Sequence, residues 1–225
     1  MLLLPGIPRL GIDKYYHGNE ALHGVVRPGR FTVFPQAIGL AATWNPELQK
    51  RVATVISDEA RARWNELDQG REQKEQFSDV LTFWSPTVNM ARDPRWGRTP
   101  ETYGEDPFLS GVMGTAFVKG LQGDDPRYLK IVSTPKHFAA NNEEHNRFVC
   151  NPQISEKQLR EYYFGFRNVC EGRKGSFYHD CLQRVERCAL YTECLAAEKG
   201  VTSGLGISGI CRFRLWGTFF IGKRP

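Results

Sequence analysis

Two polar stretches decide the fold: ARDPRWGRTPETYGEDPFL at Ala91–Leu109 and KHFAANNEEHNRF at Lys136–Phe148. Each follows a short apolar segment, at 80–84 and 129–133, with the composition of a buried β-strand. Pro107 to about Leu121 lies between them and predicts a helix. Strand, polar loop, helix and strand in succession are typical of an α/β protein with a parallel sheet.

The same alternation extends toward both ends of the chain. Ile7–Ile12 is a short strand candidate that leads toward Asn19–Gly24. Asn45, Pro46 and Glu47 supply a cap, a first-turn proline and a first-turn acid, so a helix is predicted from there to about Leu67. Ser155 and Gln158 form a capping box that predicts a helix through Phe164.

Charged side chains gather where three of the predicted strands end. In a (β/α) barrel this edge of the sheet carries the active site. Sugar hydroxyls both donate and accept, and charged groups make the strongest directional hydrogen bonds to them. The charged groups at these three ends are Glu20, Arg98, Lys136 and His137. Taken singly, each could instead be a surface charge or a structural ion pair, and His137, like His23, could be a buried structural histidine.

Five blocks of the sequence, in this order, resemble glycoside hydrolase family 3. They are IPRLGI at Ile7–Ile12, NEALHG at Asn19–Gly24, TVFPQAIGLAATWNPEL at Thr32–Leu48, and the two polar stretches quoted above. The resemblance implies a TIM-type (β/α)8 barrel, of which this chain would hold the first part. It also implies an exo-acting, retaining β-glycosidase that releases terminal β-xylosyl or β-glucosyl units without a metal or cofactor.

By the same resemblance, four residues would bind the hydroxyls of the terminal sugar in the minus-one subsite: Glu20, Arg98, Lys136 and His137. Trp96 and Tyr103 are expected to shape the loop rather than to touch substrate. The glutamate of NEALHG stands where many glucosidases of the family carry aspartate, which favours the β-xylosidase and arabinofuranosidase branch. The expected partners are therefore oligosaccharides or aryl β-glycosides.

The catalytic nucleophile is not found in the sequence. A retaining glycosidase needs a nucleophilic carboxylate and a second carboxylic acid, and family members carry the nucleophilic aspartate in a segment like GYVVSDCGA. No such segment follows Phe164. We therefore expect a fragment without glycosidase activity. A sugar-binding remnant without catalysis is one alternative, and a hydrolase that uses Glu143 or Glu144 is another.

The composition changes near residue 164. Residues 1–164 hold 20 Lys and Arg and 20 Asp and Glu. Residues 165–225 hold 10 Lys and Arg but only 5 Asp and Glu, and they contain five of the six cysteines. Codons can be chosen for Leu205–Ile221 so that reading one base later gives WGFQGYVVSDCGAPSL, which contains the missing aspartate. A frameshift close to Phe164 is therefore our hypothesis. It divides the chain into a barrel part at 1–164 and an irregular, out-of-frame tail at 165–225.

Other functions for the tail have weaker support. A metal site could use His179, Cys181, Cys188 and Cys194, but their spacing lacks the paired C-x2-C units of strong zinc sites. Arg212 and Arg214 are not accompanied by a nucleic-acid-binding motif. No apolar run approaches the roughly 18 residues of a membrane helix, and no signal peptide is recognised at the start. Neither nucleic acid nor membrane is an expected partner, and the compartment stays open.

Overall fold

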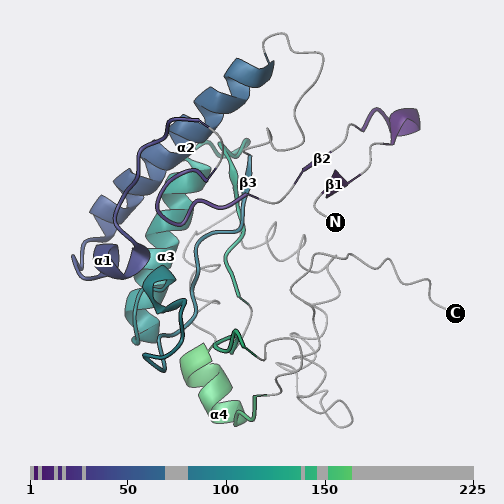
Figure 1. Ribbon diagram of the computed structural model, residues 1–225. Coiled ribbons are helices and arrows are strands. Elements are labelled where there is room, and N and C mark those ends of the chain that lie inside the picture. The colour runs from purple at the N-terminus through teal and green to yellow at the C-terminus, as the bar shows by residue number, and fades with distance from the viewer. Residues whose placement is uncertain are drawn as a thin grey trace, which may run out of the picture.

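The computed structural model describes residues 3–4, 7–12, 15–16, 19–26, 29–68, 81–137, 140–145 and 152–163 (Figure 1). The predictions made for the tail at 165–225, its irregular character and the alternative metal and nucleic-acid sites included, lie outside these residues. No helix among them is long and apolar enough to cross a membrane.

Two long helices form where the sequence predicts them. The helix α2 spans Pro46–Asp68, and the Asn45 side chain caps it by accepting a hydrogen bond from the Leu48 amide at 2.9 Å. The helix α3 spans Pro107–Gln122, and Asp106 caps it in the same way. A cap side chain satisfies one of the amides that have no partner within the first turn, so the local sequence sets both starts. The short helix α1, Ala37–Ala41, precedes α2.

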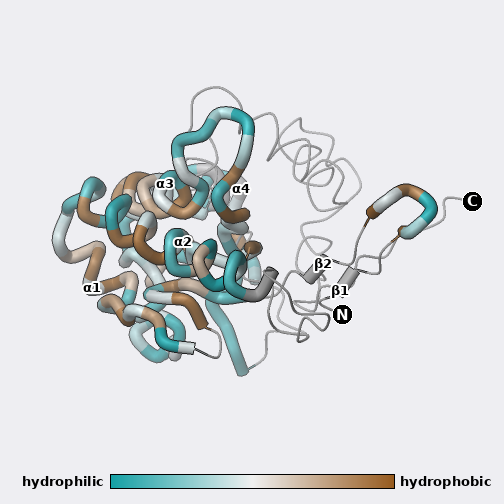
Figure 2. Tube along the Cα trace, turned by 90° about the horizontal axis from the view of Figure 1, so that it is seen from above, coloured by the Kyte–Doolittle hydropathy of each residue, from teal (hydrophilic) through white to brown (hydrophobic). Residues whose placement is uncertain are grey.

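The two long helices pack closely against each other at Gly120. A Cβ atom added there would lie 2.4 Å from the Lys50 carbonyl oxygen and 2.6 Å from the Ala53 Cβ atom, so only glycine fits. Ser57 also donates a hydrogen bond from α2 to the Gly120 carbonyl. Along α2, hydrophilic and hydrophobic residues alternate (Figure 2), as expected of a helix with one buried face. That face meets Phe83, Phe117 and other buried residues in the main core.

The sheet is parallel, as predicted. Strand β3, Thr82–Phe83, pairs in parallel with β4, Val132–Ser133. Parallel bridges also join Asn19 to Phe83 and Thr87 to Lys136. Three chain segments thus run side by side in the order of the sequence, with α2 and α3 as the crossovers between them. This is the arrangement of successive units in a TIM-type barrel.

The prediction of a strand at Ile7–Ile12 is wrong. The structure has a 3-10 helix, η1, at Pro8–Leu10, and Ile7 and Ile12 face each other across it in an antiparallel bridge. Pro8 lacks the amide of a strand residue, and Gly11 turns the chain at φ 63°, so the segment bends back. The strands that flank it are β1, Leu3–Leu4, and β2, Tyr15–Tyr16, which pair antiparallel.

The predicted capping box near the end of the described chain is confirmed. The Ser155 hydroxyl accepts from the Gln158 amide at 3.2 Å, and the Gln158 side-chain oxygen accepts from the Ser155 amide at 3.1 Å. The helix that follows begins as α4, Glu156–Gln158, and continues as the π-helical segment η3, Leu159–Tyr163. Figure 1 shows α4 at the bottom of the view, at the opposite end from the label of β3.

Candidate functional site

The structure brings together all four side chains predicted to bind sugar. Glu20 directly follows the bridge residue Asn19, and Lys136 is itself the bridge partner of Thr87. Arg98 lies in the long loop after β3, immediately before the 3-10 helix η2, Thr99–Glu101. All three positions belong to the carboxyl ends of neighbouring parallel segments, and this is why residues far apart in the sequence meet here.

Lys136 and Glu20 form an ion pair in a partly buried position. The ammonium nitrogen lies 2.5 Å from Oε1 of Glu20, and the side chains are 15% and 33% exposed. Burial raises the pKa of the Glu20 carboxyl, and the attraction to Lys136 opposes that rise. The second oxygen, Oε2, is buried and has no hydrogen-bond partner among the described residues. An acceptor in this state favours a ligand that donates a hydrogen bond.

Arg98 is held by a carboxylate that the sequence did not single out. Nε and one terminal nitrogen of its guanidinium donate to the two oxygens of Glu101 at 2.9 and 2.7 Å. Burial lowers the pKa of the guanidinium, but the hydrogen bonds and charge of Glu101 outweigh it and leave that pKa raised. The two-point contact fixes the plane of the guanidinium. Its remaining terminal nitrogen, Nη1, lies 3.5 Å from Oε1 of Glu144.

His137 is oriented by Asn89, which the sequence did not reveal either. Oδ1 of Asn89 lies 2.9 Å from the His137 backbone nitrogen and 3.0 Å from its ring Nδ1, so it accepts from both. Nε2 of the ring lies 3.3 Å from Nη1 of Arg98, a nitrogen that can only donate. This network assigns the proton to Nδ1 and leaves Nε2 as the acceptor.

Asn89 is held in turn by its own amide. Its Nδ2 donates to the Asn141 carbonyl at 2.7 Å, so the oxygen must face His137. The neighbouring Asn142 donates to the Met90 carbonyl at 2.7 Å. The loop after β4 is therefore tied to the loop after β3 at two points, next to the ring of His137.

A single series of contacts links the predicted residues. Glu20 pairs with Lys136, Lys136 is bonded to His137 along the chain, and His137 contacts Arg98. One sequence signal could have revealed Glu101, because it lies three residues after Arg98, a spacing that brings side chains together on a helical turn. No comparable signal marks Asn89, whose role depends on the pairing of two distant segments.

Three further side chains considered in the sequence analysis are Trp96, Tyr103 and His23. Trp96 and Tyr103 are buried, and the Tyr103 hydroxyl accepts from Gln49 at 3.1 Å. Burial raises the pKa of Tyr103 well above its usual value. His23 is bound through Nδ1 to the Phe34 carbonyl at 2.9 Å. Within the described ranges, no cluster of three His, Cys, Asp or Glu side chains could hold a metal ion.

The glycosyl hydrolase family 3 N-terminal domain matches residues 10–176 of the chain. The chain belongs to this family. The match covers the three parallel segments and all four clustered side chains, and it continues past the boundary expected at residue 164. The fold of the family 3 N-terminal domain, a TIM-barrel type, agrees with the parallel segments and crossover helices described above.

Relatives in this family include several β-xylosidases. A xylan 1,4-beta-xylosidase of Xylanibacter ruminicola is 44% identical over 181 residues, covering 77% of this chain and 21% of that protein. Beta-D-xylosidase 3 of Arabidopsis thaliana is 42% identical over 175 residues, covering 70% of this chain and 21% of that protein. The chain thus spans about a fifth of the length of these family 3 relatives.

Solved family 3 structures are similar to this fold. An exo-beta-xylosidase, XlnD, in complex with a xylobiose aziridine probe, superposes with a TM-score of 0.63 at 36% identity, over 73% of this chain and 22% of that one. Beta-glucosidase 3B from Thermotoga neapolitana, in complex with α-D-glucose, gives a TM-score of 0.62 at 33% identity. That match covers 75% of this chain and 22% of the glucosidase chain. Both structures contain the equivalent of this chain as a minor part.

Proposed function

We propose that the described residues form one wall of the minus-one subsite of an exo-acting, retaining β-glycosidase, and that the chain contains the first units of a (β/α)8 barrel. Glu20, Arg98, Lys136 and His137 would bind the hydroxyls of a terminal β-xylosyl or β-glucosyl unit. The oligosaccharides and aryl β-glycosides that carry such a unit are the proposed ligands. Similarity to the xylosidases of two different organisms supports xylose as the first sugar to test.

The observation that carries the proposal is the continuous polar cluster at the carboxyl ends of three strands. It combines two cations with acceptors of different kinds. Oε2 of Glu20 is a buried acceptor without a partner among the described residues, while Lys136 and Arg98 offer charged donors. A sugar hydroxyl donates and accepts at once, and a site of this composition matches it.

We further propose that the chain binds sugar without hydrolysing glycosides. The described carboxylates of the cluster are already engaged with cations: Glu20 with Lys136, and both Glu101 and Glu144 with Arg98. The nucleophilic aspartate is proposed to be encoded one base out of frame, in the region after residue 164. Without a nucleophile the covalent glycosyl-enzyme cannot form, and a retaining enzyme loses its reaction path.

Titration of the purified chain with xylose tests the binding part. Arg98→Ala should abolish saturable binding because it removes both the charged donor and the neighbour of His137. Arg95→Ala is the matched control. Arg95 lies in the same loop, pairs with Asp93 two residues away, and its side chain is 89% exposed. If Arg98→Ala and Arg95→Ala bound xylose with equal affinity, the proposed site would be contradicted.

Release of nitrophenol from aryl β-xyloside and β-glucoside tests the catalytic part. We expect no release above a blank under conditions in which xylose binds. A rate comparable to that of an intact β-xylosidase would refute the proposed loss of activity. In that event Glu143→Gln and Glu144→Gln would identify which carboxylate acts.

A further inference from the structure

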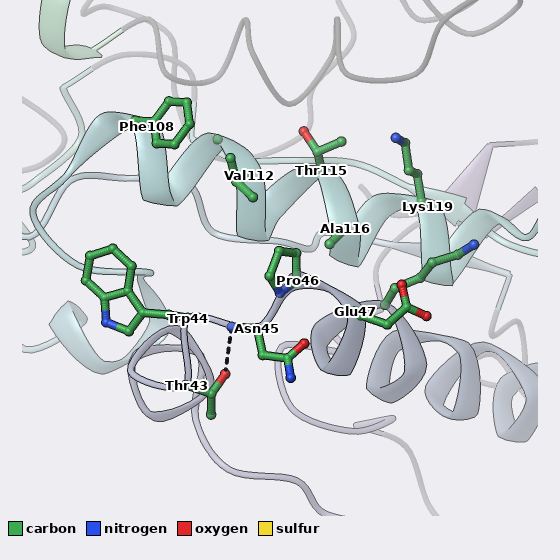
Figure 3. Close-up of a pocket in the computed structure, with 12 residues that line it drawn as sticks. Thr43, Trp44, Asn45, Pro46, Glu47, Phe108, Val112, Thr115, Ala116 and Lys119 are labelled. Atoms are coloured by element: carbon green, nitrogen blue, oxygen red, sulfur yellow. Dashed lines mark hydrogen bonds between the residues drawn. The ribbon is translucent and has the colours of Figure 1, made fainter.

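A second site candidate is a groove on the outer side of the domain. It has a volume of about 970 Å³ and lies between the start of α2, with the turn that precedes it, and the side of α3 that runs from Phe108 to Lys119 (Figure 3). Phe108, Val112 and Thr115 contribute from α3, and Trp44 and Glu47 from the opposite side. Figure 3 shows the two aromatic rings at one end of the groove and the charged side chains at the other.

Trp44 is held in the groove by its backbone. Its φ of 53° lies in the left-handed region, which is uncommon for a bulky residue. The Trp44 amide donates to the Ala41 carbonyl at 3.0 Å, and the next amide, of Asn45, donates to the Thr43 hydroxyl at 3.3 Å. The residue is nevertheless 73% exposed. The turn thus holds an indole ring outward in a strained backbone conformation, which core packing does not require.

Phe108 is presented in a comparable way. It occupies the first turn of α3, directly after the capped start at Asp106, and it is 76% exposed. The cap fixes the backbone that carries the ring. Together with Trp44 it forms a pair of exposed aromatic surfaces on two different elements.

The aromatic end of the groove lies on the same edge of the domain as the sugar-binding cluster. Helices α2 and α3 each begin after a strand segment has ended, so their first turns face the carboxyl edge. In Figure 1 the starts of both helices lie at the same end as the loop after β3. Helix α1, directly before Trp44, contacts both α3 and η2, the 3-10 helix that carries Glu101.

We propose that this groove binds a β-1,4-linked xylo-oligosaccharide at a site separate from the Arg98 cluster, and the choice of xylose as the sugar rests on the proposed function. Each pyranose ring has an apolar face of C–H groups, which stacks on aromatic rings, and a rim of hydroxyls, which needs polar partners. The groove offers both: the rings of Trp44 and Phe108, and the polar groups of Thr115, Glu47 and Lys119. Charged residues of both signs along an open groove suit a neutral polar chain better than an apolar protein face.

The test uses the full 225-residue chain and compares xylohexaose with xylose in calorimetric titrations. Trp44→Ala should weaken xylohexaose binding about tenfold and leave xylose affinity unchanged. Trp44→Phe should recover part of the loss because a ring is restored. Tyr128→Ala is the matched control, since Tyr128 is also an exposed aromatic residue, at 64%, but lies outside the groove. Circular dichroism would check that all variants fold alike.

The experiment separates this groove from the proposed function. Arg98→Ala should abolish xylose binding but retain a xylohexaose affinity that still depends on Trp44. If Trp44→Ala and Tyr128→Ala bind xylohexaose as the unchanged chain does, or if the unchanged chain does not bind it, the groove proposal is overturned. A dimer that dissociates on Trp44→Ala would assign the groove to a second copy of the chain and would equally overturn it.

Discussion

The ammonium of Lys136 lies 2.5 Å from Oε1 of Glu20, although 116 residues separate them in the sequence. Both residues stand where a parallel segment ends, so the sheet rather than the local sequence creates the pair. Because the two side chains are largely withdrawn from water, removing one leaves the other as an uncompensated charge. The pair is thus a sensitive probe of the site.

We predict that the Glu20 carboxyl titrates above its ordinary pKa of 4.5, and higher still in Lys136→Met. Burial raises this pKa, and the variant removes the attraction that opposes the rise. Carbon-13 NMR of the Glu20 carboxyl would measure both values. A pKa at or below 4.5 in the unchanged chain would show that the carboxyl is not buried as described.

The same shift predicts how stability depends on pH. A raised pKa means that the folded chain binds the Glu20 proton more tightly than the unfolded chain does. The stabilisation that the protonated Glu20 carboxyl gives to the folded chain is fully present below pH 4.5. It is lost as the pH rises through the pKa that this carboxyl has in the folded chain. Urea denaturation would give the free energy of unfolding of Glu20→Gln and of the unchanged chain. The difference between these two free energies should vary with pH in this window. A constant difference would be evidence against the shift.

His137 should be a neutral ring protonated at Nδ1, because Asn89 accepts from Nδ1 and Arg98 donates to Nε2. Long-range nitrogen–proton NMR spectra distinguish the two tautomers directly. Asn89→Ala should abolish the preference and weaken xylose binding, whereas Asn89→Asp, which retains an acceptor, should preserve the tautomer. A ring protonated at Nε2 in the unchanged chain would contradict the network.

Gly120→Ala should destabilise the fold by about 1–3 kcal/mol, since the added methyl group would meet the backbone of α2. Gly39→Ala is the control within a helix, because a Cβ atom there would lie at an ordinary 3.7 Å from the Cβ atom of Pro35. Urea denaturation would give both free energies of unfolding. If the two variants were equally stable, α2 and α3 would not approach as closely as described.

Local signals predicted the helices well, and the tertiary network poorly. The cap at Asn45 and the capping box at Ser155 act within one helical turn, so the sequence reveals them. The segment at Ile7–Ile12 is apolar enough for a strand, yet Pro8 and Gly11 bend it. Its conformation is therefore set by these two turn-forming residues and not by its apolar side chains. Asn89 could not be recognised because its partners, His137 and Asn141, come from a segment about 50 residues away that only the sheet brings near.

The frameshift hypothesis makes a prediction at the level of the gene. The nucleotides after codon 164, read one base later, should encode a barrel strand that ends in the segment containing SDCGA. Resequencing the locus would test this without any protein. If the shifted frame contains early stop codons or no such strand, the loss of the nucleophile needs another explanation.

The most direct test of the sugar site is to observe its side chains while sugar binds. In nitrogen-15-labelled chain, xylose should shift the Arg98 Nε signal and the His137 ring signals together, with one affinity, and leave the Arg95 Nε signal unchanged. Saturable xylose binding that leaves Arg98 and His137 unperturbed, or no binding at all, would contradict the assignment of this cluster as the sugar subsite.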